Sequence, residues 1–242
     1  MVDGAAPRTH RDQVFGWDIT HLPVNSTRAA VEEIRSAISL ASDNLSLLDL
    51  LHAWQRQVAA RHPLFETYGA MTTAADQHPR SRFLLLLQAL EGSFGFENRA
   101  THVAEKEKYG DKREGVLARA RNLLGEADFK FINKNLRREA QHGLDSALAD
   151  LLKRLPDEIS EELTRTELIK AVAKADTGKG TLPPQTALTM ARNTLSHGSG
   201  SFEPQHLAIV ADILERMVRS EVVRLLGAPL DAQERAAKKD ER

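Results

Sequence analysis

The chain has 242 residues, enough for one large domain or two small ones. It contains no cysteine, which excludes disulfides, thiolate zinc sites and a cysteine nucleophile, and which is typical of a reducing cytoplasm. The formal net charge of −1 argues against a protein that packages nucleic acid, because such proteins are usually strongly basic. No stretch approaches the ~18 apolar residues of a membrane span, and the N-terminus lacks a secretory signal pattern. We therefore expect a cytoplasmic protein with no membrane contact.

Helical periodicity runs through most of the chain. Only 5% of the residues are aromatic and runs of β-branched residues are scarce, which favours helix over strand. Residues 1–25 show no sustained period, so we expect an extended N-terminal arm. Apolar residues recur at helical spacing over 26–40 and again over 44–61. We predict one α-helical domain spanning residues 26–227.

Four further segments follow with different degrees of hydrophobicity. Residues 81–94 are the most apolar and lack Val, Ile and Thr, which predicts a central helix packed on most sides. Residues 103–124 are rich in charge and predict a surface helix. Residues 128–155 and 158–175 each carry leucines at helical spacing, so each is expected to form one helix.

Glycine and proline mark the boundaries in the last third of the chain. The clearest loop lies at residues 176–184, and a short helix is expected to begin near Pro184 and to stop at Gly198. A long amphipathic helix follows Pro204. Residues 228–242 are polar, and we expect them to form a frayed C-terminal tail.

The short helix carries the pattern that points most strongly to chemistry. It places Arg192, Asn193 and His197 within six residues. Arginine neutralises a phosphate, histidine transfers a proton near neutral pH, and asparagine orients the imidazole or binds a sugar hydroxyl. RNA supplies its own nucleophile, the 2′-hydroxyl, so these groups suffice for transesterification without a metal or another cofactor. DNA lacks that hydroxyl and should resist.

The spacing alone is a weak signal. With 22 arginines and 9 histidines in 242 residues, about 0.8 such pairs are expected by chance, and a second pair, Arg137 and His142, occurs inside the helix predicted at 128–155. The Arg192 pair lies between two loops, where a substrate can approach. The alternative is an ordinary helix end, with the arginine paired to an acid and the histidine capping carbonyls. Glu91 either partners the arginine or is an ordinary carboxylate at the end of the core.

The segment formed by Arg192, Asn193 and His197 resembles the signature of the HEPN superfamily, which has an arginine, a polar residue and then, a few residues later, a histidine. The apolar helix that begins near Ser81, its distance to Arg192 and the closing helix are similar to the ApeA-like branch, over residues 80–227. The resemblance implies a helical bundle that pairs through its motif-bearing helices, with both copies lining one cleft. It also implies metal-independent RNA cleavage, often in defence against phage.

The residues and the resemblance together predict an all-α, HEPN-type bundle with extra N-terminal helices, acting as a homodimeric endoribonuclease. Its catalytic residues would be Arg192, Asn193 and His197, with RNA as substrate and no cofactor or metal.

Two other functions stay open. One is a non-catalytic dimerisation module, and the other is the toxin of a toxin–antitoxin pair, so an antitoxin or a sensor domain is a further candidate partner. A metal enzyme is least favoured, because no His/Asp/Glu cluster has ligand spacing.

Overall fold

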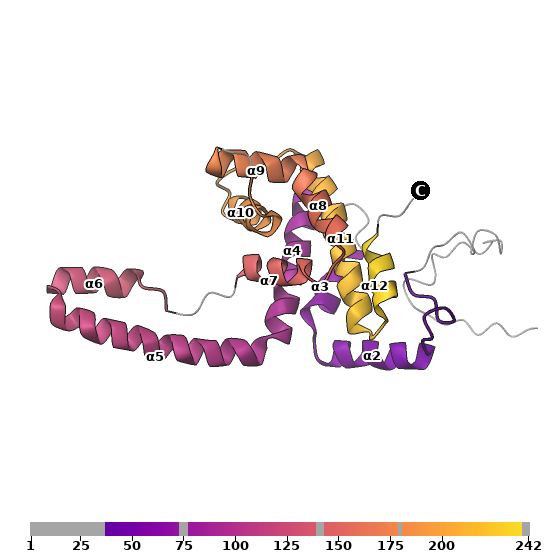
Figure 1. Ribbon diagram of the computed structural model, residues 1–242, viewed down its shortest axis with the longest axis horizontal. Coiled ribbons are helices and arrows are strands. Elements are labelled where there is room, and N and C mark those ends of the chain that lie inside the picture. The colour runs from indigo at the N-terminus through magenta and orange to yellow at the C-terminus, as the bar shows by residue number, and fades with distance from the viewer. Residues whose placement is uncertain (1–36, 73–76, 139–142, 179–180, 239–242) are drawn as a thin grey trace, which may run out of the picture. The chain divides into compact units, whose positions relative to one another are not determined.

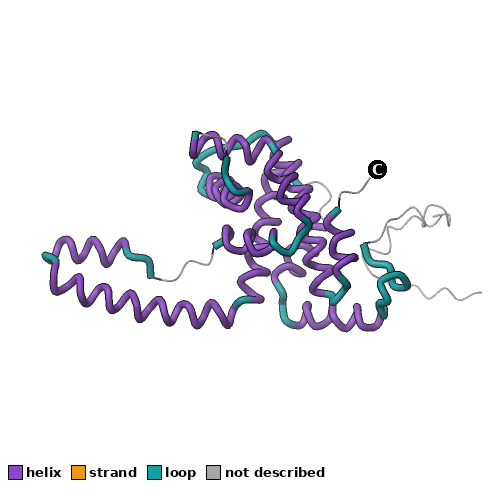
Figure 2. Tube along the Cα trace, viewed as in Figure 1, coloured by secondary structure: helices purple, strands orange, loops and turns teal. Residues whose placement is uncertain are grey.

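The computed structural model describes residues 37–72, 77–138, 143–178 and 181–238. These residues form helices and connecting turns, and no strand occurs among them (Figures 1 and 2). In chain order the helices are α2 (Leu47–Ala59), α3 (Pro63–Thr72), α4 (Pro79–Glu97), α5 (Arg99–Leu123), α6 (Glu126–Asn135), α7 (Leu144–Leu152), α8 (Asp157–Arg165), α9 (Glu167–Thr177), α10 (Pro184–Ser196), α11 (Pro204–Leu225) and α12 (Leu230–Ala237). The all-α class is confirmed, and the HEPN type stays a prediction.

Two long helices, α4 and α11, pack against each other at the centre of the fold. The apolar run of α4 buries Phe83, Leu86, Leu87 and Leu90. Burying one such side chain stabilises a fold by about 1.5–3 kcal/mol, so this run is a major part of the core. The prediction of a central helix at residues 81–94 is confirmed.

Shorter helices cover these two. α3 and α7 pack against α4, α8 and α12 pack against α11, and α10 packs against α4, α7 and α9. Helix α2, predicted at residues 44–61, is capped by Ser46, whose hydroxyl accepts a hydrogen bond from the Asp49 amide. Ala53 is the only buried residue of α2. The core therefore lies between α3, α4 and the helices from α7 onward.

The α5–α6 hairpin (residues 99–138) differs from the rest of the fold, because neither of its helices has a buried residue. The two helices pack against each other, and Arg113 Nη2 donates to Asn133 Oδ1 at 2.8 Å between them. The prediction of a surface helix over 103–124 is confirmed.

The prediction of a single helix over residues 128–155 is wrong, because the segment forms two separate helices, α6 and α7. Gly143 is extended there, with ψ of 174°, and it precedes the first residue of α7. Helix α6 has already ended at Asn135, where the following Leu136 is extended with ψ of 120°, so Gly143 marks only the start of α7. Arg137 therefore lies outside a helix, and His142 lies outside the described residues.

The helix predicted at residues 158–175 is likewise divided, at Thr166, into α8 and α9. The Thr166 hydroxyl donates to the carbonyl of Leu163 at 2.7 Å, and the Thr166 backbone is extended, with ψ of 147°. A hydroxyl that binds a carbonyl of the preceding turn competes with helical hydrogen bonding, which explains the break.

The C-terminal segment also differs from its expectation. Residues 228–242 were expected to fray, but Leu230–Ala237 forms α12, which packs against α11. Its buried residues are Ala232, Ala236 and Ala237. Alanine adds little to a hydrophobic pattern, so a polar composition concealed a helix with a packed face.

At the other end, the arm expected at residues 1–25 lies outside the described residues, as does most of the helix predicted over 26–40. Leu40 belongs to a turn rather than to that helix, and its carbonyl accepts a hydrogen bond from the Leu45 amide at 2.9 Å. Asn44 adopts a positive φ of 52° in this turn, a conformation that asparagine tolerates better than most residues.

Candidate active site

Helix α10 carries Arg192 and Asn193, with His197 as its C-cap, and it buries the opposite part of its surface. The helix begins at Pro184, as predicted. The missing amide hydrogen of proline costs nothing at a first helical position. The residues it buries recur at helical spacing and are Ala187, Leu188, Ala191 and Leu195. Asn193 and His197 are exposed, and Arg192 is half-buried. Packing of the apolar face therefore fixes α10 with the motif towards solvent.

The guanidinium of Arg192 is held by two acceptors. Nη2 donates to Oε2 of Glu91 on α4 at 3.1 Å, and Nη1 donates to Oδ1 of Asn193 at 3.2 Å. The side chains of Arg192 and Glu91 are 35% and 33% exposed, so this ion pair is open to solvent. Of the two alternatives left open for Glu91, the structure shows the pairing with the arginine. The contact suits an oriented catalytic arginine and an ordinary helix-end ion pair equally well.

His197 caps the C-terminus of α10 through its backbone and leaves its imidazole exposed. Gly198 adopts a left-handed φ of 66°. The Ser199 amide donates to the Thr194 carbonyl at 3.1 Å and the Gly198 amide to the Leu195 carbonyl at 3.3 Å. This pattern is a Schellman motif, which glycine favours at the left-handed position. Backbone groups thus cap the carbonyls that the histidine was considered to cap.

Arg80, at the start of α4, is a cation that sequence reasoning missed. Its Nη2 donates to the carbonyl of Leu195 at 2.5 Å. A guanidinium at the C-terminus of a helix interacts favourably with the helix dipole, so Arg80 adds a second cap and a second positive charge at the end of α10 that carries His197. No sequence signal marks it, because it acts across 115 residues.

The structure brings Arg192 and Asn193 together but does not bring His197 to them. Among the described residues, the His197 imidazole makes no hydrogen bond with either side chain. Positions five apart on a helix differ by roughly 140° of rotation, and Arg192 turns towards Glu91 instead of towards the histidine. The asparagine oxygen accepts from the arginine, which leaves its amide nitrogen as the group free to bind a substrate.

Two hollows lie elsewhere on the molecule. One of about 230 Å³ is lined by Glu162, Arg165, Thr166, Glu167, His206 and Ile209. Another of about 430 Å³ is lined by Phe94, Asn98, Asp145, Ser146, Ala149, Asp150 and Lys153. Neither hollow includes Arg192 or His197.

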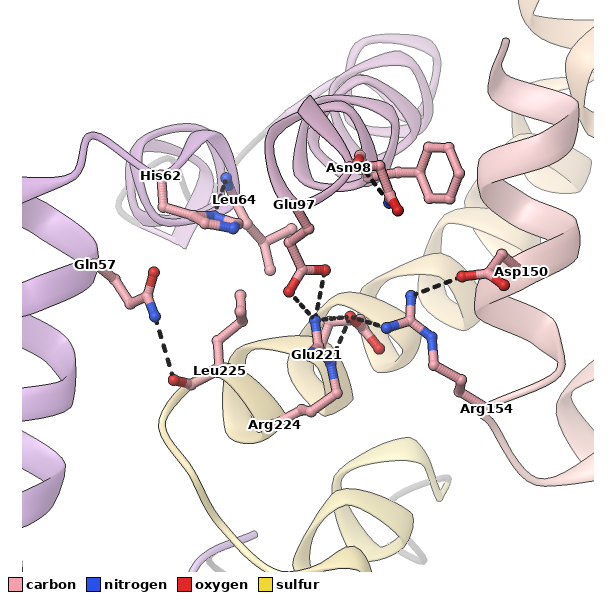
Figure 3. A network of polar contacts seen from close by, with 11 residues as sticks. Gln57, His62, Leu64, Glu97, Asn98, Asp150, Arg154, Glu221, Arg224 and Leu225 are labelled. Atoms are coloured by element: carbon pink, nitrogen blue, oxygen red, sulfur yellow. Dashed lines mark hydrogen bonds and ion pairs between the residues drawn. The ribbon is translucent and has the colours of Figure 1, made fainter. Parts of the chain in front are cut away.

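A network of charges adjoins the larger hollow, and Figure 3 shows it from close by. Arg224 Nη2 lies 2.7 Å from both carboxylate oxygens of Glu97 and 2.9 Å from Glu221 Oε2. Arg154 lies 3.8 Å from Glu221 and 3.6 Å from Asp150. Each arginine is thus paired with carboxylates, which is typical of a structural network between α4, α7 and α11.

No group of three or more histidine, aspartate or glutamate side chains placed to hold a metal ion occurs in the part of the chain that the structure describes. The helices described here also include none with the length and hydrophobicity needed to cross a bilayer.

Comparisons with known proteins leave the HEPN resemblance as a prediction. No protein-family model matches the chain, and no curated protein or solved structure is significantly similar to it.

Proposed function

We propose that this protein is a metal-independent endoribonuclease whose active site includes Arg192, Asn193 and His197. The observation that supports it is the arrangement on α10. A guanidinium held by Glu91 and an exposed imidazole follow each other along one solvent-facing segment. A phosphodiester is an anion that a guanidinium binds in bidentate fashion, and an imidazole transfers protons near neutral pH.

In the proposed reaction, the 2′-oxygen of a ribose attacks the adjacent phosphorus and the bond from phosphorus to the 5′-oxygen breaks. An imidazole removes the proton of the 2′-hydroxyl, and another imidazole protonates the leaving 5′-oxygen. The Arg192 guanidinium stabilises the charge that develops on the phosphoryl oxygens. The products are a 2′,3′-cyclic phosphate and a 5′-hydroxyl.

The reaction as proposed uses two chains. Within one chain, Arg192 and His197 diverge by roughly 140° around α10, and the arginine is bonded to Glu91. A homodimer formed through α10 would supply two imidazoles and two guanidiniums to one cleft, as the HEPN resemblance implies. The same resemblance suggests a role in defence against phage.

Cleavage of a mixed RNA in the presence of EDTA tests the proposal. We expect His197→Ala to lower the rate by about 10²–10⁴-fold, because it removes the proton-transfer group. The backbone at His197 is right-handed helical, with φ of −88° and ψ of −4°, so alanine fits and the fold is preserved. His52→Ala is the matched control, since His52 is an exposed histidine on α2. Equal cleavage by the wild type and the His197 variant would refute the assignment.

Glu91→Gln tests whether Glu91 acts by positioning the arginine. The amide keeps the size of the side chain and loses the charge, so we expect a rate loss of about 10–100-fold from the misplaced guanidinium, with little change in Tm. Glu91→Asp should recover part of the rate. An unchanged rate in Glu91→Gln would show that the ion pair has no part in cleavage.

The non-catalytic dimerisation module is the second candidate, and one observation favours it. Arg192 already has an acidic partner, as in many structural ion pairs. Size-exclusion chromatography with light scattering separates the two functions. A stable dimer that cleaves no RNA would support the module.

A further inference from the structure

The charge of this protein is unevenly distributed. Residues 99–138, the α5–α6 hairpin, contain 11 lysines and arginines against 6 aspartates and glutamates, a net charge of +5. The whole chain carries −1, so the other residues together carry −6. The hairpin is therefore a basic element of an otherwise acidic protein.

Within α5, most charges of like sign share a face, although Glu105 lies on the face of the basic residues and Arg121 on that of the acidic ones. Glu107, Asp111 and Glu114 follow each other at helical spacing on one face. Lys108, Lys112 and Arg119 lie on a second face, roughly 110° away, and define the basic stripe. The stripe runs for about 16 Å along the helix axis.

The basic stripe has no role in the fold. All three of its side chains are exposed, and none forms an ion pair with another described residue. Lys108 and Lys112 are four residues apart, a spacing at which like charges destabilise a helix. Lys108 has Glu105 and Asp111 three residues away, whereas Lys112 and Arg119 have no carboxylate three or four residues away. Such a stripe is stabilised when a polyanion binds along it.

An aromatic side chain accompanies the charge on α6. Phe131 is 68% exposed, and Lys134 lies near it on the outward part of the same helix. Lys130 lies on that part too and pairs with Glu126 at 2.6 Å. The inward residues Phe129 and Ile132 are half-buried towards α5. Exposed aromatic rings beside cations are typical of surfaces that bind single-stranded nucleic acids, because bases stack on the ring while phosphates contact the cations.

We propose that the α5–α6 hairpin binds single-stranded RNA, with the basic stripe contacting phosphates and Phe131 stacking on a base. The inference rests on the proposed function only for the identity of the polyanion. Because the hairpin contains none of the residues of the α10 motif, binding and cleavage can be measured separately.

Fluorescence anisotropy tests the inference with the full chain and a labelled 2′-O-methyl RNA of about 20 nucleotides, longer than a typical single-strand site. This strand has no free 2′-hydroxyl and is not cleaved. We expect the triple variant Lys108→Gln, Lys112→Gln and Arg119→Gln to lower affinity by about tenfold or more at about 100 mM salt. The slope of log affinity against log salt should fall by about 2, since each single-strand phosphate contact contributes about 0.7.

A second triple variant controls for net charge. Lys153→Gln, Lys174→Gln and Lys238→Gln remove the same charge from exposed positions outside the hairpin, and we expect near-wild-type affinity. Equal loss in both triple variants, or no loss in either, would overturn the proposal. The proposal would also be overturned if the stripe variant kept its affinity for RNA but lost affinity for an acidic peptide.

Phe131→Ala distinguishes single strands from duplexes. We expect about a tenfold loss of affinity for the single strand and no change for duplex RNA, whose bases are already stacked. Equal loss for both would exclude stacking. His52→Ala, outside both the hairpin and the α10 motif, should bind the 2′-O-methyl strand like the wild type. Wild-type protein that binds this strand through the stripe but cleaves no RNA would contradict the proposed function and leave this inference standing.

Discussion

At the scale of single residues, the contact between Glu91 and Arg192 shows how far sequence reasoning reached. The motif identifies the arginine, whereas the sequence leaves Glu91 between a partner of that arginine and an ordinary carboxylate at the end of the core. Arg80 could not be found in this way, because its contact with the Leu195 carbonyl depends on how α4 and α10 pack. Local spacing predicts residues on one helix, whereas contacts across the bundle need the tertiary fold.

His62 is a buried histidine outside the α10 motif, and it makes the stability of the fold depend on pH. It is 1% exposed, and its ring lies 4.7 Å from that of Phe96. Nδ1 accepts a hydrogen bond from the Leu64 amide, and Nε2 has no hydrogen-bond partner among the described residues. Burial lowers the pKa of His62 below 6.5, opposed by the Glu97 carboxylate and assisted by the Arg224 guanidinium.

We predict that the free energy of unfolding falls as the pH drops below about 6.5. With the lowered pKa, the unfolded chain binds a proton at His62 before the folded chain does, so acid favours unfolding in the window between the two pKa values. His62→Asn retains an acceptor for the Leu64 amide but does not titrate. Urea unfolding at several pH values should give a shallower acid slope for this variant, and equal slopes would contradict the prediction.

At the scale of elements, the sequence predicted the helices whose apolar residues are large and regularly spaced. These are α4, α10 and α11, which build the core and present the motif. The sequence does not reveal the breaks at Thr166 and after Asn135, because the apolar spacing continues across both, and at Thr166 a single hydroxyl decides the break. Helix α12 was missed for the opposite reason, since its packed face consists of alanines.

We predict that Ala232→Glu destabilises the fold by at least about 2 kcal/mol. Ala232 is fully buried on α12, against α11, and a carboxylate placed there would lose its hydration and overfill the contact. Lys238→Glu places the same side chain at an exposed position after α12 and should change stability little. Thermal unfolding of the two variants and the wild type measures the difference in Tm. Equal Tm values would mean that α12 does not dock as described.

At the scale of the whole molecule, buried charge joins helices that are distant in sequence. Glu221 is 3% exposed and lies between Arg224 and Arg154, which ties α11 to α4 and α7. Arg216, also on α11, donates to Glu162 of α8 at 2.5 Å and to the Ala237 carbonyl of α12 at 3.3 Å. Such pairs are sensitive to the loss of one partner, because the remaining charge stays buried.

Glu221→Gln should lower the free energy of unfolding by about 1.5–3 kcal/mol, since it removes the buried charged acceptor that the two arginines share. Each arginine keeps its second carboxylate, Glu97 or Asp150. The matched control is Glu161→Gln, which breaks an exposed pair with Arg165 on α8, and we expect a change of about 0.2–1 kcal/mol. Urea denaturation measures both. Similar losses in the two variants would show that the Glu221 network is no more important than a surface pair.

The absence of buried residues in α5 and α6 has a consequence for how this protein can diverge. Helices α4 and α7, which precede and follow the hairpin in sequence, pack directly on each other. Insertions, deletions or charge reversals between residues 99 and 138 therefore leave the interior intact. The α5–α6 hairpin can change its surface in evolution while the core of the bundle is conserved.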